Sequence, residues 1–256
     1  HGCYRRMALS WCDSIAFDVV KPRLDSLDGS VLTFAIRGAS ARAAENTIEA
    51  FRLAIELGAS GIASEAWPTA DGDAVLHRDA RVGPRFRRRR IDQVARDQLP
   101  THLCSVEDLY EVLDPSSSVS IDLQDPVAFD PVVAAARNAG GETERRLWLS
   151  HPELETLTAL RRRTAARLVL SSSLRSLGTG PERCAAELRE RGIDGLRLHH
   201  SEWHGGLVAL LHRFERYALG WGPEHEREMA KLVNAGIDAV ASSRIDRMTA
   251  VMAQFE

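Results

Sequence analysis

The sequence is poor in cysteine and has no long apolar run. Its four cysteines are scattered, with no C-x-x-C pair and no histidine at zinc-finger spacing, which argues against a structural zinc site or a redox pair. No segment approaches the roughly 20 consecutive apolar residues of a membrane-spanning helix. Residues 1–10 have neither a leading methionine nor the apolar core of a secretory signal. We therefore expect a cytoplasmic protein with reduced thiols and no transmembrane segment.

A large excess of one charge is also missing. The formal net charge is −3 and the pI is about 6.3, so the whole-chain field does not attract nucleic acid or an anionic membrane. Positive charge is concentrated locally, at Arg78, Arg81, Arg85 and residues 87–90. This stretch suits an anionic head group or partner, or it is a solvated loop. Because the stretch contains a single aromatic residue, Phe86, and not the interleaved aromatic series of single-strand binders, we expect no nucleic-acid partner.

What the sequence does contain is a regular alternation of short apolar runs and helical stretches. With 256 residues, 44% of them hydrophobic, the chain can form one domain with a continuous core. Helical periodicity is clear at 46–57 and 181–191. The runs that we predict to be strands are 34–38, 61–67, 74–76, 119–123, 147–150, 168–172, 195–199, 217–221 and 239–242. Such alternation predicts a parallel sheet.

The number of strands favours a closed barrel with one addition. The sequence T-A-D-G from Thr69 has the Asp-Gly signature of a tight hairpin, so one early strand is an extra hairpin partner. An open doubly wound sheet is the rival fold, but neither of its usual glycine-rich phosphate loops is present. We predict a (β/α)₈ TIM barrel over residues 32–256, preceded by an N-terminal extension, residues 1–31, that packs on the barrel or leads into it.

Several predicted strands end in polar residues. In a (β/α)₈ barrel these carboxyl ends carry ligands and catalysts, so the residues are candidates for a pocket lining, although serines there also cap helices. They are Arg37, Glu65, Arg78, Asp79, Asp122, Ser150, His151, residues 171–173, His199, His200, Ser242 and Ser243.

Several motifs resemble the glycerophosphodiester phosphodiesterase family. They are F-A-I-R-G-A-S from Phe34, E-N-T-I-E-A-F from Glu45, T-A-D-G from Thr69 and A-G-I-D-A-V from Ala235. The resemblance spans roughly residues 32–248 and implies a TIM barrel of the phospholipase-C-like phosphodiesterase type. It also implies phosphoric diester hydrolysis in lipid metabolism, with a divalent metal and two catalytic histidines.

The resemblance breaks at the positions of those histidines. Ile36 and Arg78 stand where the family keeps its general base and acid. Isoleucine cannot transfer a proton, and each lost acid–base group forfeits about 10²–10⁴ in rate. His77 would restore a histidine only through a bulge, because neighbouring strand residues face opposite sides. His77 and Asp79 are the remaining candidates for catalytic residues.

The metal positions also depart from the family pattern. Ala63 replaces the family's metal-binding Glu, Glu65 replaces its Asp, and Gln124 stands for the lysine of the E-x-K strand. Asp122 retains an acid. Glu65 and Asp122 are therefore the candidate ligands for a weakly bound Mg²⁺ or Ca²⁺, or they pair with arginines and no metal binds.

The ligand-binding candidates are Arg37, Glu45, Arg78, His199 and Trp221. Arginine suits phosphate, and the losses of His and Glu make part of the pocket more apolar. We therefore expect a homologue that is degenerate for hydrolysis, a pseudoenzyme, and that binds a small phosphate ester or an amphiphile. The alternatives are a repurposed barrel enzyme with different chemistry and an active phosphoric diester hydrolase with a rearranged site. The sequence leaves the oligomeric state open.

Overall fold

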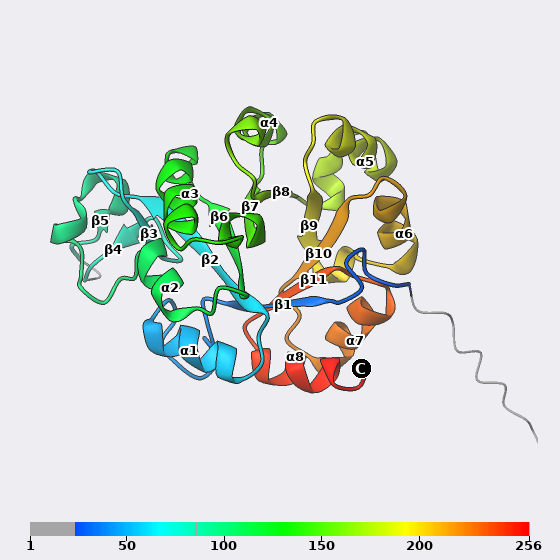
Figure 1. The fold of residues 1–256 in the computed structure, drawn as a ribbon, viewed down its shortest axis with the longest axis horizontal. Coiled ribbons are helices and arrows are strands. Elements are labelled where there is room, and N and C mark those ends of the chain that lie inside the picture. The colour runs from blue at the N-terminus through cyan, green and yellow to red at the C-terminus, as the bar shows by residue number, and fades with distance from the viewer. Residues whose placement is uncertain (1–23, 85, 256) are drawn as a thin grey trace, which may run out of the picture.

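The chain folds into a closed barrel of eight parallel strands wrapped by helices (Figure 1). The computed structural model describes residues 24–84 and 86–255. Pairing of β1 with both β2 and β11 closes the barrel. The barrel strands are β1 (Leu32–Ile36), β2 (Gly61–Pro68), β6 (Ser118–Leu123), β7 (Leu147–His151), β8 (Arg167–Ser171), β9 (Gly195–His199), β10 (Tyr217–Trp221) and β11 (Ala239–Ser242).

Helices follow the barrel strands and cover the outside of the barrel. Each turns an apolar stripe to the strands; in the first, Ala50, Phe51 and Ala54 are buried and Thr47 caps the amino end. The α-helices are α1 (Ile48–Glu56), α2 (Val106–Val112), α3 (Phe129–Asn138), α4 (Leu154–Leu160), α5 (Pro181–Glu190), α6 (Gly205–Arg213), α7 (Glu226–Asn234) and α8 (Ile245–Met252). Short 3₁₀ turns are η1 (Ile91–Gln93), η2 (Arg96–Gln98), η3 (Pro126–Ala128), η4 (Thr143–Arg146), η5 (Arg161–Arg163), η6 (Leu174–Leu177) and η7 (His200–Glu202).

The predicted TIM barrel and its extra strand are both confirmed. Each predicted run is a strand, and β3 (Ala74–Leu76) pairs antiparallel with β2 as the hairpin partner. The first strand ends earlier than predicted, at Ile36. The reason is that Arg37 has a φ of 55° and so leaves the extended conformation.

The inside of the barrel is filled by inward-facing side chains at alternate strand positions. Phe34, Trp148 and Leu219 are among the residues of this inner cluster. Trp148 makes edge-to-face contacts with Phe34 and Tyr217, with ring centroids 6.3 and 5.2 Å apart. The guanidinium of Arg167 lies 4.6 Å from the Trp148 ring centroid and closes the amino-terminal end of the barrel. The open end is therefore the carboxyl end.

A structured segment, residues 77–104, is inserted between β3 and α2. It contains η1, η2 and a small antiparallel hairpin of β4 (Arg81–Val82) and β5 (Arg89–Arg90), which lies at the edge of the molecule beyond β3 (Figure 1). A separate apolar cluster fixes it to the hairpin of β2 and β3. The cluster consists of Val75, Val82, Ile91, Val94, Leu99 and Leu103, with Trp67 packed against it.

Most of the predicted N-terminal extension lies outside the described residues. Within residues 24–31, the carboxylate of Asp28 accepts hydrogen bonds from Tyr217 and Arg167, at 2.9 and 3.1 Å, beneath the barrel. Its boundary at residue 31 stays a prediction. In the part of the chain that the structure describes, no helix has the length and apolar character needed to cross a bilayer, and Cys104 and Cys184 are free and buried.

Candidate functional site

A cavity of about 540 Å³ opens at the carboxyl end of the barrel. Its lining comes from strands β1, β2, β6, β9, β10 and β11 and from residues that follow strands, and it is polar and apolar in about equal parts. Ligand sites in this fold lie at this end of the barrel. It is lined by Ile36, Arg37, Ala63, Ser64, Glu65, Arg78, Asp122, Arg197, His199, Trp221, Gly222, Glu224, Ala241 and Ser243.

The backbone around Arg37 holds its side chain over the cavity. Arg37 has a φ of 55°, a conformation uncommon for a residue with a side chain, and its N–H donates to Ala63. Its carbonyl accepts from the N–H of Asn46, which has a φ of 57°. Gly38 follows because a Cβ there would lie 2.6 Å from the backbone of Ala50. The R-G motif therefore has a structural reason: the chain turns sharply while the arginine stays inward.

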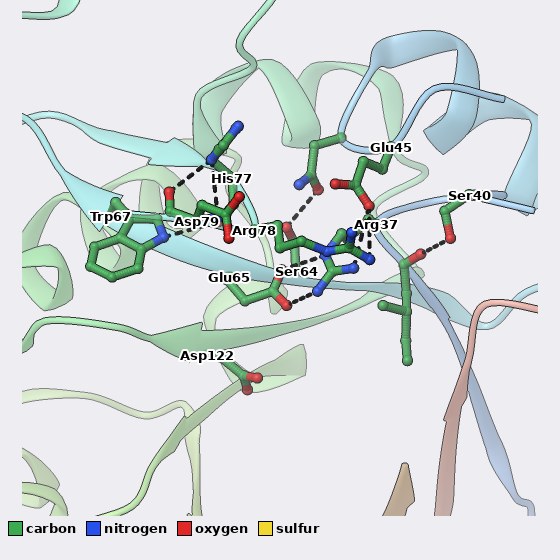
Figure 2. Close-up of polar contacts among 12 residues, drawn as sticks. Arg37, Ser40, Glu45, Ser64, Glu65, Trp67, His77, Arg78, Asp79 and Asp122 are labelled. Atoms are coloured by element: carbon green, nitrogen blue, oxygen red, sulfur yellow. Dashed lines mark hydrogen bonds and ion pairs between the residues drawn. The ribbon is translucent and has the colours of Figure 1, made fainter. Parts of the chain in front are cut away.

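Arg37 joins the carboxylates of Glu65 and Glu45 (Figure 2). Its Nε donates to Glu65 Oε2 at 2.8 Å, its Nη2 donates to the other oxygen of Glu65, and its Nη1 donates to Glu45 at 3.3 Å. Burial opposes the charge of Arg37, but Glu65 and Glu45 together raise its pKa above the usual value. Arg78 reaches Glu45 at 3.5 Å with its side chain 57% exposed, so it is the least constrained of these cations.

A second arginine–carboxylate pair lies next to the first, because Asp122 is the register partner of Glu65 on the neighbouring strand. Arg197 on β9 donates two hydrogen bonds to Asp122 on β6, with 2.6 Å between Nη2 and Oδ2. Ser150 donates to the same carboxylate, and Ser171 accepts from Arg197 at 3.1 Å. Bidentate pairs of this kind fix both partners in orientation.

These pairs bear on the candidate metal ligands, Glu65 and Asp122. The two residues are in register on neighbouring strands, as ligands of a shared ion would be. Both oxygens of each carboxylate, however, already accept from an arginine, and Arg37 and Arg197 would have to move before an ion could bind. Among the described residues no group of three or more His, Cys, Asp and Glu side chains is placed to hold a metal. The donor set in this arrangement does not fit Mg²⁺ or Ca²⁺.

The residues at the two family histidine positions differ in placement from the remaining catalytic candidates, His77 and Asp79. Ile36 and Arg78 both line the cavity, whereas His77 and Asp79 do not. His77 lies in a separate hollow of the inserted segment, and its Nδ1 accepts from the N–H of Asp79 at 3.1 Å (Figure 2). Strand alternation thus turns His77 away from Arg78, and the structure does not bring His77 and Asp79 to the barrel mouth. Their catalytic role stays a prediction.

His199 and Trp221 form an aromatic wall at the mouth. Their ring centroids are 4.9 Å apart in an edge-to-face arrangement, and Trp221 is 40% exposed. The ring of His200 lies 4.2 Å from that of His199, in a tilted arrangement. Burial, with a contribution from His199, lowers the pKa of His200 below its usual value.

Two charged cavity residues were missed from the sequence, Arg197 and Glu224. Arg197 had a signal, because in the strand G-L-R-L-H it lies two positions before His199 and must face the same side. Glu224 lies in a loop and had none.

Comparison with known proteins supports the resemblance. A family model described as the glycerophosphoryl diester phosphodiesterase family matches residues 37–110. The match covers less than half of the chain, and over this segment the chain is similar to that family. No curated protein matches the chain.

Solved glycerophosphodiester phosphodiesterases have the same fold. The enzyme from Thermotoga maritima is 19% identical, with a TM-score of 0.75 over 87% of this chain and 98% of that one. The enzyme from Agrobacterium tumefaciens is 17% identical, with a TM-score of 0.71 over 86% and 100%. A phosphodiesterase from Oleispira antarctica, in complex with the product sn-glycerol-3-phosphate, is 17% identical, with a TM-score of 0.71 over 87% and 96%. At these identities the likeness shows the fold.

Set against the glycerophosphodiester phosphodiesterase motifs, the chain keeps the residues that shape the turn after β1. Arg37, Gly38, Glu45 and Asn46 are all present, and all take part in holding that turn or in its ion pairs. The acid–base position beside them is Ile36. These four residues therefore have a structural role in the turn after β1.

Proposed function

We propose that this protein binds a small phosphate-bearing molecule at the barrel mouth and is degenerate for the metal-dependent hydrolysis of glycerophosphodiesters. The observation that carries the proposal is the pairing of Glu65 with Arg37 and of Asp122 with Arg197. The family resemblance implies a divalent metal ion between these carboxylates. In this protein the guanidinium groups of Arg37 and Arg197 neutralise them instead.

Arg37 and Arg78 have N–H groups that are not used in hydrogen bonds within the protein and can donate to a ligand. A guanidinium has five donors. Arg37 uses three for Glu65 and Glu45, and the pair with Glu45 at 3.3 Å is the weakest. Arg78, which pairs only at 3.5 Å, is free to turn toward a phosphate. Phosphate oxygens match the planar fork of arginine well.

The rest of the cavity suits the body of a phosphate ester. Ile36, Ala63, Ala241 and Trp221 give it an apolar side, which fits glycerol carbons or a short hydrocarbon. The Oleispira antarctica relative was solved with sn-glycerol-3-phosphate, which supports a ligand of this size. The cytoplasmic location expected from the sequence stays a prediction.

Loss of hydrolysis follows from the missing acid–base groups. Neither Ile36 nor Arg78 can exchange a proton at neutral pH, and two such losses cost about 10⁴–10⁸ in rate. The cavity's arginines would bind and orient the phosphate, and the apolar wall would exclude water from one side of it.

A hydrolysis assay tests the first claim, that the protein does not hydrolyse glycerophosphodiesters. Pure protein is incubated with a glycerophosphodiester and Mg²⁺ or Ca²⁺, beside Glu65→Gln and Asp122→Asn variants. We expect no release of sn-glycerol 3-phosphate above that of the variants. Release that both substitutions abolish would establish the rearranged phosphodiesterase instead.

Titration of the same product tests the binding half. In EDTA, Arg78→Ala is expected to weaken binding of sn-glycerol 3-phosphate about tenfold, because one charged hydrogen bond to phosphate is lost. Arg78→Lys should retain part of the affinity. Arg145→Ala, which removes a 72% exposed arginine at the far end of the barrel, is the matched control. Equal affinity for Arg78→Ala and the native protein contradicts the binding site.

One observation favours a second candidate, acid–base chemistry by His199. Its Nδ1 is hydrogen-bonded to Ser201 at 2.8 Å, and its ring lines the cavity beside Trp221 and Gly222. That orientation leaves Nε2 available to a ligand. Turnover of a phosphate-free substrate that His199→Gln abolishes would favour this repurposed enzyme.

A further inference from the structure

The inserted segment is strongly positive, whereas the rest of the chain has a net negative charge. Residues 78–90 contain seven arginines and one aspartate, a net charge of +6 in a chain whose net charge is −3. Except for Val82 and Ala80, the described residues of this stretch are exposed. The positive charge therefore forms a local field directed toward solvent.

The hairpin places like charges against each other. Arg81 and Arg90 are direct partners across β4 and β5. Like charges opposite each other destabilise a strand pair. Asp92 relieves this repulsion at Arg90, with Nε to Oδ1 at 2.9 Å, whereas Arg81 forms no ion pair with any described residue. An external anion at Arg81 would remove the repulsion.

A hollow beside the hairpin is suited to such an anion. Its volume is about 420 Å³, and its polar lining consists of Arg81, Arg88, His77 and His102. Arg88 reaches only Asp79, at 3.5 Å, with both side chains about half exposed. Exposed and weakly paired arginines exchange partners at little cost. The hollow is thus a positively charged candidate site for an anion, separate from the cavity at the barrel mouth.

An exposed aromatic side chain accompanies this charge. Phe86 is 95% exposed, between β4 and β5. The hairpin beneath it is not loose, because Val82 and Ile91 are buried in the cluster that anchors the segment. A basic surface with an exposed phenylalanine suits the interface of an anionic bilayer.

We propose that the described part of the inserted segment, residues 77–84 and 86–104, docks the protein on membranes rich in anionic phospholipid. Its arginines attract the lipid phosphates, the hollow binds one head group, and Phe86 enters the interface. Arg78, near the start of this segment, also lines the barrel cavity, so docking brings the cavity rim to the lipid surface. A single aromatic side chain offers no stacking platform for a nucleic-acid strand, which is why a membrane is favoured over RNA.

Vesicle co-sedimentation of the full chain tests this docking. We expect binding to equimolar phosphatidylcholine and phosphatidylglycerol, little binding to phosphatidylcholine alone, and a fall in binding as salt is raised. Arg81→Ala with Arg88→Ala should weaken binding about fivefold per arginine. Phe86→Ala should weaken it about tenfold with little change in salt dependence.

A charge-matched control separates the site from net charge. Arg145→Ala with Arg213→Ala removes two exposed arginines at the amino end of the barrel and should leave vesicle binding unchanged. Arg81→Lys with Arg88→Lys should retain binding, since positive charge is kept. Three results overturn the proposal: equal binding to neutral vesicles, a lysine variant as weak as the alanine variant, or binding of a short single-stranded RNA without binding of vesicles. The affinity for sn-glycerol 3-phosphate should not change in these variants, so this test is independent of the barrel-mouth proposal.

Discussion

Arg197 on β9 reaches past two intervening strands to hold both carboxylate oxygens of Asp122 on β6. The partners are 75 residues apart in the sequence and lie mostly out of solvent, with side-chain exposures of 16% and 22%. The pair crosses the mouth of the barrel at the position where the family resemblance implies a metal ligand. The contribution of this pair to the free energy of unfolding can be measured directly.

Removal of Arg197 alone should destabilise the barrel. Arg197→Met leaves the Asp122 carboxylate without its cation in a mostly buried place, at an expected cost of about 2–4 kcal/mol in the free energy of unfolding. Arg197→Met combined with Asp122→Leu should recover more than half of that loss, since no charge is stranded. Urea unfolding measures both. Equal losses in the single and double variants would mean that Arg197 contributes packing alone.

Both candidate metal ligands should bind a cation only after their arginines are removed. In the native protein, Mg²⁺ or Ca²⁺ at millimolar concentration is expected to leave the melting temperature unchanged. In an Arg37→Met and Arg197→Met variant, Glu65 and Asp122 become two uncompensated carboxylates in register, and Ca²⁺ should stabilise the variant. A calcium-induced rise of equal size in the native protein would show that the arginines do not block the site.

The lowered pKa of Glu144 predicts that the free energy of unfolding falls at acidic pH. Hydrogen bonds from Arg137, Thr164 and Ala165 lower the pKa of Glu144 to about 2. Because this pKa is below the ordinary value near 4.5, the stabilisation is fully present above pH 4.5 and is lost as the pH falls toward 2. Glu144→Gln should therefore cost about 1–3 kcal/mol at neutral pH. In pH-dependent urea unfolding the gap between native and variant should narrow between pH 4.5 and 2; a constant gap contradicts the prediction.

Trp221 is expected to contribute to the binding of a phosphate ester and not to the binding of inorganic phosphate. Its exposed ring lies on the apolar side of the cavity, at 40% exposure, where it can cover the carbon part of a ligand. Trp221→Ala is expected to weaken sn-glycerol 3-phosphate several-fold, about 1 kcal/mol, and to leave inorganic phosphate unchanged. Competition titration compares the two. Equal weakening of both ligands would place Trp221 next to the phosphate.

The fold was predictable because its signals are local. Alternating apolar runs locate the strands, and Asp71-Gly72 identifies the antiparallel hairpin of β2 and β3. Strands β4 and β5 were not predicted, since each is two residues long and rich in arginine.

The candidate site was predictable only in part. Strand ends indicate which residues face the mouth, and Arg37, Glu65, Arg78, Asp122, His199 and Trp221 are indeed together there. Which acid pairs with which arginine depends on the closure of the whole barrel, so the Arg197–Asp122 pair has no local signal. The direction of His77, away from the cavity that Arg78 lines, agrees with the strand alternation read from the sequence.

The most direct test of the account is the metal dependence of phosphate-ester binding. Calorimetric titration of sn-glycerol 3-phosphate is carried out in EDTA and again with excess Mg²⁺, on the native protein and on Arg78→Ala. The account predicts binding in EDTA, a change of less than about threefold with Mg²⁺, and a loss of about tenfold in the variant. Binding that requires Mg²⁺, is abolished by Glu65→Gln and is unaffected by Arg78→Ala would contradict it.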